Sequence, residues 1–342
     1  TIELRVINVV KDDMICEVIV GGEIGTRKNV NITDIKLDLQ PLTPKDIKDL
    51  EFAIENKVDF VGLSFVRKAS EVIKLKQIIR KHRSSIHVIA KIENAEGLKN
   101  IDSIIRAADG IMVARGDLGI QLPIEDIPHV QKDIIAKCKE MGKPVITATQ
   151  MLDSMIKNPR PTRAEVTDVA NSIIDGTDAV MLSGETSIGK YPIRAVEIMN
   201  RIARRTEIEL EFKGTEKVKY DSTNLQESLS RSVCQSAYEM NASAIIVFTI
   251  TGASAKRISK LRPHAPIIAV TPNKEELARL NIFWGVLPFY VEQPRSTDLF
   301  LTENIKEIRK LPFIKKKSVA IIVGGIPLNQ PGNTNFMKIH IL

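Results

Sequence analysis

A short run of apolar residues recurs five times between positions 58 and 182, and each run ends at glycine or polar residues. In the stretches between these runs, apolar residues recur every three or four positions, as they do along one face of a helix. Apolar strands that alternate with amphipathic helices are typical of a parallel sheet covered on both faces. The predicted strands are residues 58–63, 87–93, 110–114, 144–148 and 179–182.

One of the intervening helices has a clear start and a clear end. Thr162 and Glu165 have the spacing of a capping box, in which each side chain bonds the backbone amide of the other residue. Gly176 suits the left-handed conformation that ends many helices. The apolar positions between them predict one buried stripe, formed by Val166, Val169, Ala170, Ile173 and Ile174.

Strand–helix units with polar groups at the strand ends predict an α/β protein of the TIM-type (β/α)8 barrel class. Residues 39–210 supply five such units. A closed barrel of this class has about eight, so we expect an incomplete barrel here, with the missing strands upstream of Thr1. Residues 1–38 are rich in predicted strands but too few to bury a core, and they predict part of a small β domain. A polar linker at 211–220 opens a second α/β domain that fills residues 211–342.

The charge of the chain favours small anionic partners over nucleic acid. The formal net charge is +7 and the sequence pI is about 9.2. The basic residues are scattered among 42 acidic ones and aromatic residues make up only 4% of the chain, whereas a nucleic-acid surface needs clustered Lys and Arg, often with stacking rings. The run Lys315–Lys317 is interpreted as a solvated loop, and phosphorylated small molecules are the expected partners.

The cysteines and the hydropathy indicate a cytoplasmic protein with no membrane partner. The three cysteines are far apart and form no CxxC pair, which is typical of a reducing compartment. No apolar stretch approaches the roughly 18 residues needed to span a bilayer. The start of the chain has no resemblance to a signal peptide.

The strongest candidate chemistry lies at the ends of two neighbouring predicted strands. Lys91 and Glu93 are two residues apart in a strand, so their side chains face the same way. Asp117 follows the next strand and would bring a second carboxylate beside Glu93. Two carboxylates about 4 Å apart repel by roughly 4 kcal/mol at an effective dielectric constant of 20. A cation with oxygen ligands, Mg²⁺ or Mn²⁺, would relieve this repulsion; the alternative is that Lys91 and Glu93 simply neutralise each other.

The turn Gly116-Asp117-Leu118-Gly119 is a candidate anion site, because bare backbone amides at a turn bind carboxylate or phosphate. Thr149, at the end of another strand, could bond the same anion or pass it a proton. The alternatives are that the glycines only punctuate a loop and that Thr149 only forms a turn. Three further residues at strand ends are supporting candidates for the active site: Ser64, Ser183 and Glu185.

The second domain has a candidate phosphate site of its own. Residues 248–255 join a predicted strand to a predicted helix and combine hydroxyl groups, a glycine and fresh helix amides. The segment lacks the lysine of a P-loop, so it does not imply nucleotide hydrolysis. The competing interpretation is a plain helix N-cap by Thr251 or Ser254.

Several motifs together resemble the pyruvate kinase family over essentially the whole chain. They are IAKIEN at 89–94, IMVARGDLG at 111–119, GKPVITATQMLDSM at 142–155, PRPTRAE at 159–165 and DAVMLSGET at 178–186. The resemblance implies a barrel, a β lid inserted after its third strand and a C-terminal α/β domain that often holds an allosteric site. Residues 1–38 would be the C-terminal part of the lid, 39–210 the latter barrel strands and 211–342 the regulatory domain.

The resemblance implies phosphoryl transfer from phosphoenolpyruvate to ADP, which gives pyruvate and ATP in the last step of glycolysis. Lys91 would stabilise the phosphoryl group in flight and the developing enolate oxygen. Glu93 and Asp117 would hold Mg²⁺ or Mn²⁺. The amides of Gly116 and Asp117, with Thr149, would grip the carboxylate of phosphoenolpyruvate or pyruvate, and Thr149 would help to deliver the proton to enolpyruvate.

The resemblance also implies sites outside the catalytic centre. Lys28 is similar to a lid lysine that reaches the nucleotide phosphate of ADP or ATP, and Thr249, Thr251, Gly252 and Ser254 resemble a pocket for a phosphorylated allosteric effector. The family's K⁺ would have its ligands outside this chain, and a homotetramer is expected. Two alternatives stay open, a metal-dependent pyruvate aldolase-like barrel and a non-catalytic effector-binding module.

Overall fold

The computed structural model describes residues 2–26, 30, 42–210, 223–292, 304–326 and 332–342. It divides into two compact units, Thr1–Leu39 and Gln40–Leu342. Two sequence-based predictions, the nucleotide lysine Lys28 and the linker at 211–220, lie outside the described residues.

The first unit is an antiparallel hairpin of β1 (Glu3–Val10) and β2 (Asp13–Val20). Its apolar side chains are largely exposed; Ile7 and Met14, for example, are each 62% exposed. Two strands alone have no second layer against which to bury a face. The predicted β character of this segment is therefore confirmed for the residues of the hairpin.

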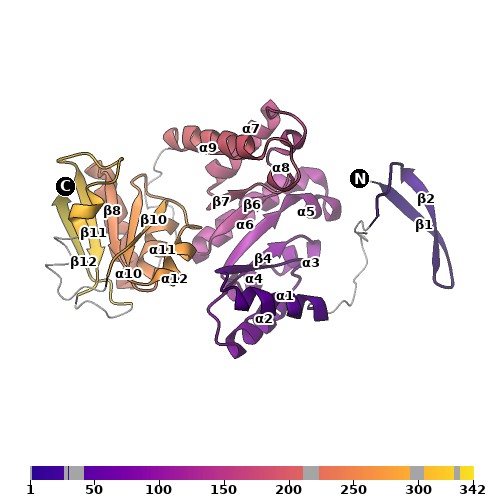
Figure 1. Ribbon diagram of the computed structural model, residues 1–342, viewed down its shortest axis with the longest axis horizontal. Coiled ribbons are helices and arrows are strands. Elements are labelled where there is room, and N and C mark those ends of the chain that lie inside the picture. The colour runs from indigo at the N-terminus through magenta and orange to yellow at the C-terminus, as the bar shows by residue number, and fades with distance from the viewer. Residues whose placement is uncertain (1, 27–29, 31–41, 211–222, 293–303, 327–331) are drawn as a thin grey trace. The chain divides into compact units, whose positions relative to one another are not determined.

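The second unit begins with a five-stranded parallel sheet (Figure 1) in the order β3-β4-β5-β6-β7. The strands are β3 (Phe60–Leu63), β4 (His87–Ile92), β5 (Gly110–Ala114), β6 (Val145–Ala148) and β7 (Ala179–Met181). All five match the predicted strands to within two residues at each end. The sheet is open in the part of the chain that the structure describes, with β3 and β7 at its edges. Because the strands are parallel and in register, their carboxyl ends lie along one edge.

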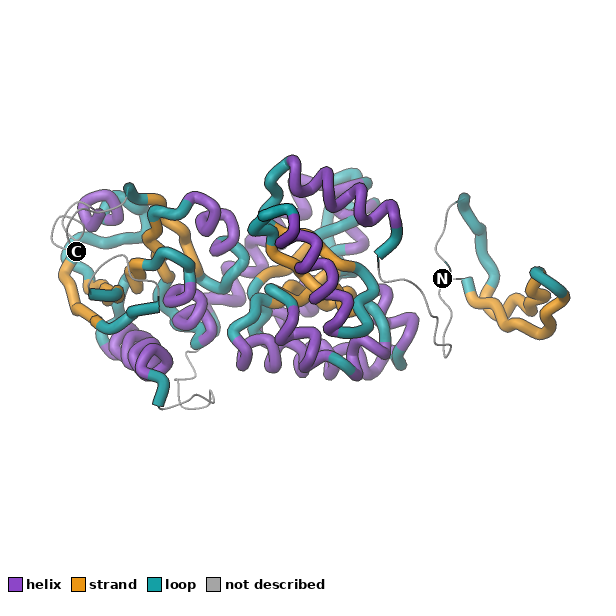
Figure 2. Tube along the Cα trace, turned by 90° about the horizontal axis from the view of Figure 1, so that it is seen from below, coloured by secondary structure: helices purple, strands orange, loops and turns teal. Residues whose placement is uncertain are grey.

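Helices alternate with the strands along this part of the chain (Figure 2). They are α1 (Pro44–Glu55), α2 (Ala69–Lys81), α3 (Ala95–Lys99), α4 (Ile101–Ala107), α5 (Arg115–Gln121), α6 (Ile127–Met141), α7 (Arg163–Asp175), α8 (Gly184–Ser187) and α9 (Pro192–Ile208). One core packs β3–β6 against α2, α4 and α6, with Ile92, Ile104 and Ile134 completely buried. A second core joins α7 and α9 through Val169 and Ile198. These two cores fix the strand ends that carry the candidate chemistry.

Helix α7 confirms the predicted capping box. The Thr162 hydroxyl accepts from the Glu165 amide at 3.2 Å, the Glu165 carboxylate accepts from the Thr162 amide at 2.7 Å, and Gly176 ends the helix at φ +99°. The predicted stripe is wrong at Ile174, whose side chain is 51% exposed. Ser172 is buried instead and bonds Gln131 of α6. Two residues correspond to about 200° around a helix, so Ile174 points away from the face that packs on α6.

The C-terminal part of the second unit is a separate α/β layer structure. Its elements are α10 (Leu225–Glu239), β8 (Ala244–Phe248), α11 (Ala253–Lys260), β9 (Ile267–Thr271), α12 (Lys274–Leu280), β10 (Val286–Tyr290), β11 (Val319–Gly324) and β12 (Phe336–Ile341). The sheet order is β10-β9-β8-β11-β12, and only β12 runs antiparallel to its neighbour. Apolar residues pack on both faces of this sheet. The predicted second α/β domain is thus confirmed.

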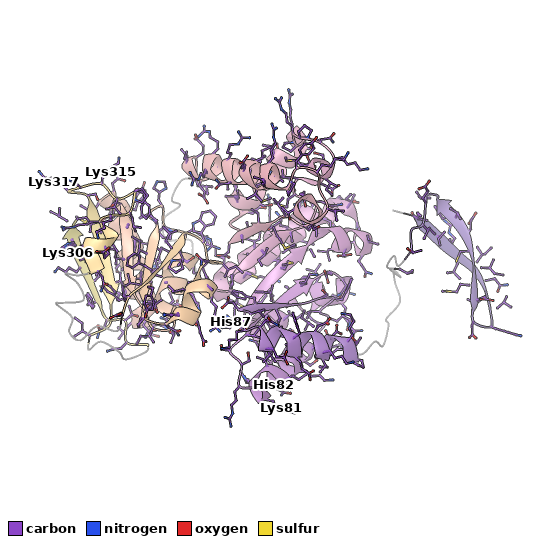
Figure 3. The ribbon with its side chains drawn as sticks, viewed as in Figure 1. Lys81, His82, His87, Lys306, Lys315 and Lys317 are labelled. Atoms are coloured by element: carbon purple, nitrogen blue, oxygen red, sulfur yellow. The ribbon has the colours of Figure 1, made fainter. Side chains whose placement is uncertain are left out.

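The two sheets of this unit are joined at the amino ends of strands β4–β7. Asp178, just before β7, accepts hydrogen bonds from Arg262 at 2.9 Å and from the backbone amides of Trp284 and Val145 at 3.0 Å each. The Arg262 guanidinium also lies 5.3 Å from the centre of the Trp284 ring. His87, the first residue of β4, lies beside this junction (Figure 3). The carboxyl ends of the strands therefore lie at the opposite edge of the sheet, away from the C-terminal domain.

Candidate active site at the carboxyl ends of the strands

Lys91 links the ends of two neighbouring strands. Its ammonium group lies 2.8 Å from Glu93 Oε1 and donates to the Ser64 hydroxyl, after β3, at 2.9 Å. The Lys91 side chain is 26% exposed, whereas the Glu93 side chain is only 2% exposed. The predicted same-side orientation of Lys91 and Glu93 is what this ion pair requires. The ammonium group thus remains within reach of a ligand while its carboxylate partner is buried.

The Glu93 carboxylate is held at both oxygens. Oε2 accepts a hydrogen bond from the Phe65 amide at 2.6 Å, while Oε1 faces Lys91. Phe65 has a left-handed backbone, with φ +52°, which turns its amide into the site. Buried carboxylates are stable when they are paired and hydrogen-bonded. This arrangement orients the Glu93 carboxylate before any ligand binds.

Asp117 completes an acidic pair with Glu93. It lies in the first turn of α5, directly after β5, and is partly buried. Desolvation by burial, followed by repulsion from Glu93, raises the pKa of the Asp117 carboxyl above its ordinary value, while Lys91 acts in the opposite direction. The alternative that Lys91 merely neutralises Glu93 is therefore incomplete, because one ammonium group faces two carboxylates. A net negative charge remains at this point of the sheet.

This donor set fits a hard divalent cation. Within the described residues, no group of three or more His, Cys, Asp or Glu side chains could hold a metal ion. Mg²⁺ commonly uses only one or two protein carboxylates and completes its octahedron with water and substrate oxygens. Glu93 and Asp117 supply that minimum, and burial together with repulsion from Glu93 raises the pKa of the Asp117 carboxyl, which a bound cation would offset.

The candidate anion site at Gly116–Gly119 lies next to Thr149. The Gly116 amide donates to Thr149 Oγ1 at 2.7 Å, and this hydroxyl donates to the Ala148 carbonyl at 2.6 Å. A Cβ atom on Gly116 would lie 3.4 Å from Thr149 Oγ1, at van der Waals distance, which shows how closely the two residues approach. One amide and one hydroxyl thus converge at the strand ends.

Arg115 is a residue of the site that the sequence reasoning named only as part of a motif. It is 8% exposed, forms a 2.7 Å ion pair with Asp168 of α7 and donates to the Thr149 carbonyl at 2.8 Å. A charged residue directly after a buried strand was the available signal, since such residues are almost never buried unless paired. Its partner, 53 residues away in the sequence, was not foreseeable.

The supporting candidates differ in what they do. Ser64 contacts Lys91, as described above. Glu185 is 1% exposed and accepts from the backbone amides of Leu152 at 3.0 Å and Ser183 at 2.9 Å. Its carboxylate thus ties the segment after β6 to the end of β7 and is not directed at a ligand. The Ser183 residue itself is exposed.

The candidate phosphate segment of the C-terminal domain lies between β8 and α11. The N-cap of α11 is Gly252, at φ +74°, without a side-chain cap, so the alternative of capping by Thr251 or Ser254 is wrong. Thr249 and Ser254 are buried and Thr251 is exposed; Ser254 Oγ hydrogen-bonds Thr334. Because the N-cap residue is glycine, no side chain caps the backbone amides at the start of α11, and these amides are suited to binding an anion.

The labelled basic residues of the described chain lie on separate elements. Lys315 and Lys317 lie in the loop before β11, whereas Lys81 and His82 lie at the end of α2 (Figure 3). All of Lys315–Lys317 are exposed, in keeping with a solvated loop. Among the described residues, no helix has the length and apolar character needed to cross a membrane.

The parallel strands and the charged groups at their carboxyl ends place the chain among α/β proteins with a barrel-type domain. A family model described as "Pyruvate kinase, barrel domain" matches residues 1–196, and one described as "Pyruvate kinase, alpha/beta domain" matches residues 227–340. The chain belongs to the pyruvate kinase family.

Curated relatives agree over the whole chain. It is 43% identical over 345 residues to the pyruvate kinase of Geobacillus stearothermophilus, 43% over 343 residues to that of Staphylococcus epidermidis and 44% over 345 residues to that of Staphylococcus aureus. Each comparison covers 100% of this chain but 59% of the relative. The chain thus spans about three fifths of the length of these relatives.

The acidic pair predicts an unusual pH dependence of stability. A raised folded-state pKa means that ionised Asp117 destabilises the fold, so Asp117→Asn should unfold at a higher urea concentration than the wild type at pH 7.5 in EDTA. The gain should shrink as the pH falls through the raised folded-state pKa and vanish below the ordinary aspartate value of about 4, where the wild-type carboxyl is protonated in both states.

The matched control is Asp133→Asn on α6, which removes an exposed carboxylate paired with Lys137. This substitution should be neutral or slightly destabilising both at pH 7.5 and at the low end of the titration. A less stable Asp117→Asn variant at pH 7.5, or a gain that does not change with pH, contradicts the account of the acidic pair.

Proposed function

We propose that the natural polypeptide carrying this chain is a pyruvate kinase, which transfers the phosphoryl group of phosphoenolpyruvate to ADP and releases pyruvate and ATP. The observation that carries the proposal is the contact of Lys91 with Glu93 beside the unbalanced charge of Asp117. Phosphoryl transfer needs positioned positive charge more than covalent chemistry. The 43–44% identity to curated pyruvate kinases supports the choice of substrates.

Lys91 is assigned the role of neutralising the transferred group. An ammonium group has three N–H donors. In the structure the Lys91 ammonium group contacts Glu93 and Ser64, so that a third N–H group can donate to a phosphoryl or enolate oxygen. Fixed donors aimed at developing negative charge stabilise a transition state without reorganisation. Glu93 and Ser64 would hold the ammonium group in that orientation.

Glu93 and Asp117 would hold the divalent cation, Mg²⁺ or Mn²⁺. When bound, the ion would supply charge neutralisation at the phosphoryl and enolate oxygens. The two residues have separate tasks. Glu93 is fixed by the Phe65 amide and by Lys91, whereas partly exposed Asp117 is free to adjust to the ion.

The Gly116 and Asp117 amides and the Thr149 hydroxyl would bind the substrate carboxylate. The bond from the Gly116 amide to Thr149 Oγ1 supports this assignment, because a carboxylate could accept from both donors in place of that bond. After phosphoryl transfer, the Thr149 hydroxyl would help to deliver a proton to the methylene carbon of enolpyruvate in its enolate form, so that this carbon becomes the methyl group and the enolate oxygen becomes the carbonyl oxygen of pyruvate.

The remaining assignments rest on the family alone. Lys28 would contact the phosphates of ADP or ATP, K⁺ would be held by ligands outside this chain, and the protein would be a cytoplasmic homotetramer. A phosphorylated effector would bind Thr249, Thr251, Gly252 and Ser254 at the start of α11. The uncapped amides of that helix support the effector site.

Activity and binding assays distinguish the kinase from the two alternative functions. A metal-dependent pyruvate aldolase-like barrel would use the same acidic pair but has no need of the C-terminal α/β domain. It predicts aldol cleavage without ADP, whereas the kinase predicts pyruvate formation that requires ADP. A non-catalytic module predicts effector binding without turnover by the natural polypeptide.

The catalytic assignment predicts a large loss for Lys91→Ala. In the natural polypeptide, kcat in a coupled assay for ADP-dependent pyruvate formation should fall by about 10³-fold or more, because a fixed cation facing the transferred group is lost. Lys45→Ala, which removes an exposed lysine paired with Asp49 on α1, should leave kcat unchanged. Wild-type turnover by Lys91→Ala would show that the assignment is wrong.

The effector assignment predicts a selective loss for Gly252→Ala. Gly252 has φ +74°, and a Cβ atom there would lie 2.8 Å from Leu280 Cδ2. Gly285 has a similar φ of +65° but nothing within 4 Å, so Gly285→Ala brings similar backbone strain without the collision. Calorimetry with sugar phosphates and AMP should show effector binding to the wild type and Gly285→Ala and weakened binding to Gly252→Ala. Equal affinities in all three would refute the assignment.

A further inference from the structure

Thr149 and Gln150, at the end of β6, have an unfavourable backbone conformation. Their φ angles are +68° and +54°, in the left-handed region. A β-branched residue such as threonine is a genuine outlier there. Such a conformation persists only where the surrounding structure imposes it, and it often occurs at functional sites.

The guanidinium of Arg115 contacts the backbone of both residues. Nη2 of Arg115 donates to the Thr149 carbonyl and to Met151 Sδ at 2.8 Å each and approaches the Gln150 carbonyl at 3.5 Å. Both left-handed residues thus direct their carbonyls at one cation. Nη1 donates to Asp168 at 2.7 Å and to Gln131 at 3.3 Å. With the side chain only 8% exposed, the guanidinium is fixed on both sides.

This geometry connects Arg115 in two ways to the Gly116 amide and the Thr149 hydroxyl, the two donors assigned above to the substrate carboxylate. Its own chain leads directly into Gly116, whose amide contacts Thr149 Oγ1 at 2.7 Å. Its side chain holds the backbone of Thr149 in the conformation that brings the hydroxyl to that amide. One residue therefore sets both halves of the pair.

We propose that Arg115 is a positioning residue: its guanidinium, oriented by Asp168, holds Thr149 in the left-handed conformation and so assembles the site for the substrate carboxylate. The proposal rests on the proposed function for the identity of the substrate. Arg115 itself does not contact substrate. Lysine could keep the charge beside Asp168, but it lacks the planar fork that serves a carboxylate and two carbonyls at once.

The test is steady-state kinetics of Arg115→Lys in the natural polypeptide. The KM for phosphoenolpyruvate should rise by about tenfold or more while the KM for ADP stays unchanged, since only the carboxylate site is disturbed. Gln150→Gly in the Arg115→Lys background should restore part of the affinity, because glycine adopts a positive φ without strain. A phosphoenolpyruvate KM within about twofold of wild type, or equal increases for both substrates, overturns the proposal.

A matched control separates positioning from general stability. Lys76 is also a partly buried cation, 20% exposed, that bonds a carboxylate and a backbone carbonyl, Asp109 and Ala107, but at the amino end of the sheet. Lys76→Met should lower the thermal midpoint without changing either KM. If Arg115→Lys does not fold, Asp168→Asn gives the milder test, since Asp168 is 39% exposed and its loss should still raise the phosphoenolpyruvate KM by about threefold.

A crystal structure of Arg115→Lys tests the proposal without any activity. Thr149 should return to a negative φ and its hydroxyl should leave the Gly116 amide. If Thr149 keeps its left-handed conformation, the proposal fails whatever reaction the protein catalyses. If the wild-type polypeptide shows no turnover with phosphoenolpyruvate and ADP, the proposed function fails while this structural test of Arg115 still stands.

Discussion

Two carboxylates and one ammonium group share the carboxyl edge of the first parallel sheet, and this imbalance of charge organises the candidate site. Lys91 contacts Glu93 at 2.8 Å, yet burial in the first place and repulsion from Glu93 in the second still raise the pKa of Asp117. A neutral residue in place of one of the two acids would remove this repulsion and stabilise the fold. Retaining both is useful if a cation and a negatively charged substrate complete the arrangement, as in phosphoryl transfer.

The opposite edge of the same sheet shows a different balance. There Asp178 satisfies its charge with Arg262 and with two backbone amides, and its side chain is 2% exposed. Left-handed residues occur at both edges, at Phe65, Thr149 and Gln150 near the carboxyl ends and at Lys57, Arg83 and Arg262 on the amino side. The two edges therefore differ in charge: the junction with the C-terminal domain pairs its buried acid, whereas the edge where the chemistry is proposed keeps two acids beside one ammonium group.

Much of this arrangement was predictable because local pattern and position in a parallel sheet are sufficient to specify it. The apolar runs gave the five strands of the first sheet, and alternation along β4 put Lys91 and Glu93 on one side. Other features were not predictable, because they depend on contacts between residues far apart in the sequence. Arg115 contacts Asp168, 53 positions away, and Arg262 contacts Asp178, 84 positions away. The left-handed Thr149 runs against the preference of β-branched residues for extended backbone, and Ile174 is exposed because α7 packs on α6 through Ser172. The role of Lys28 stays a prediction.

The most direct test of the central claim is a titration of Mn²⁺ followed by electron paramagnetic resonance. The account predicts that the wild type binds Mn²⁺ and that Glu93→Gln and Asp117→Asn each weaken binding strongly. Lys91→Met should bind Mn²⁺ more tightly than the wild type, because the competing ammonium group is gone while both acids remain. Equal Mn²⁺ affinity in the wild type and in both acid variants would contradict the claim that Glu93 and Asp117 form a cation site.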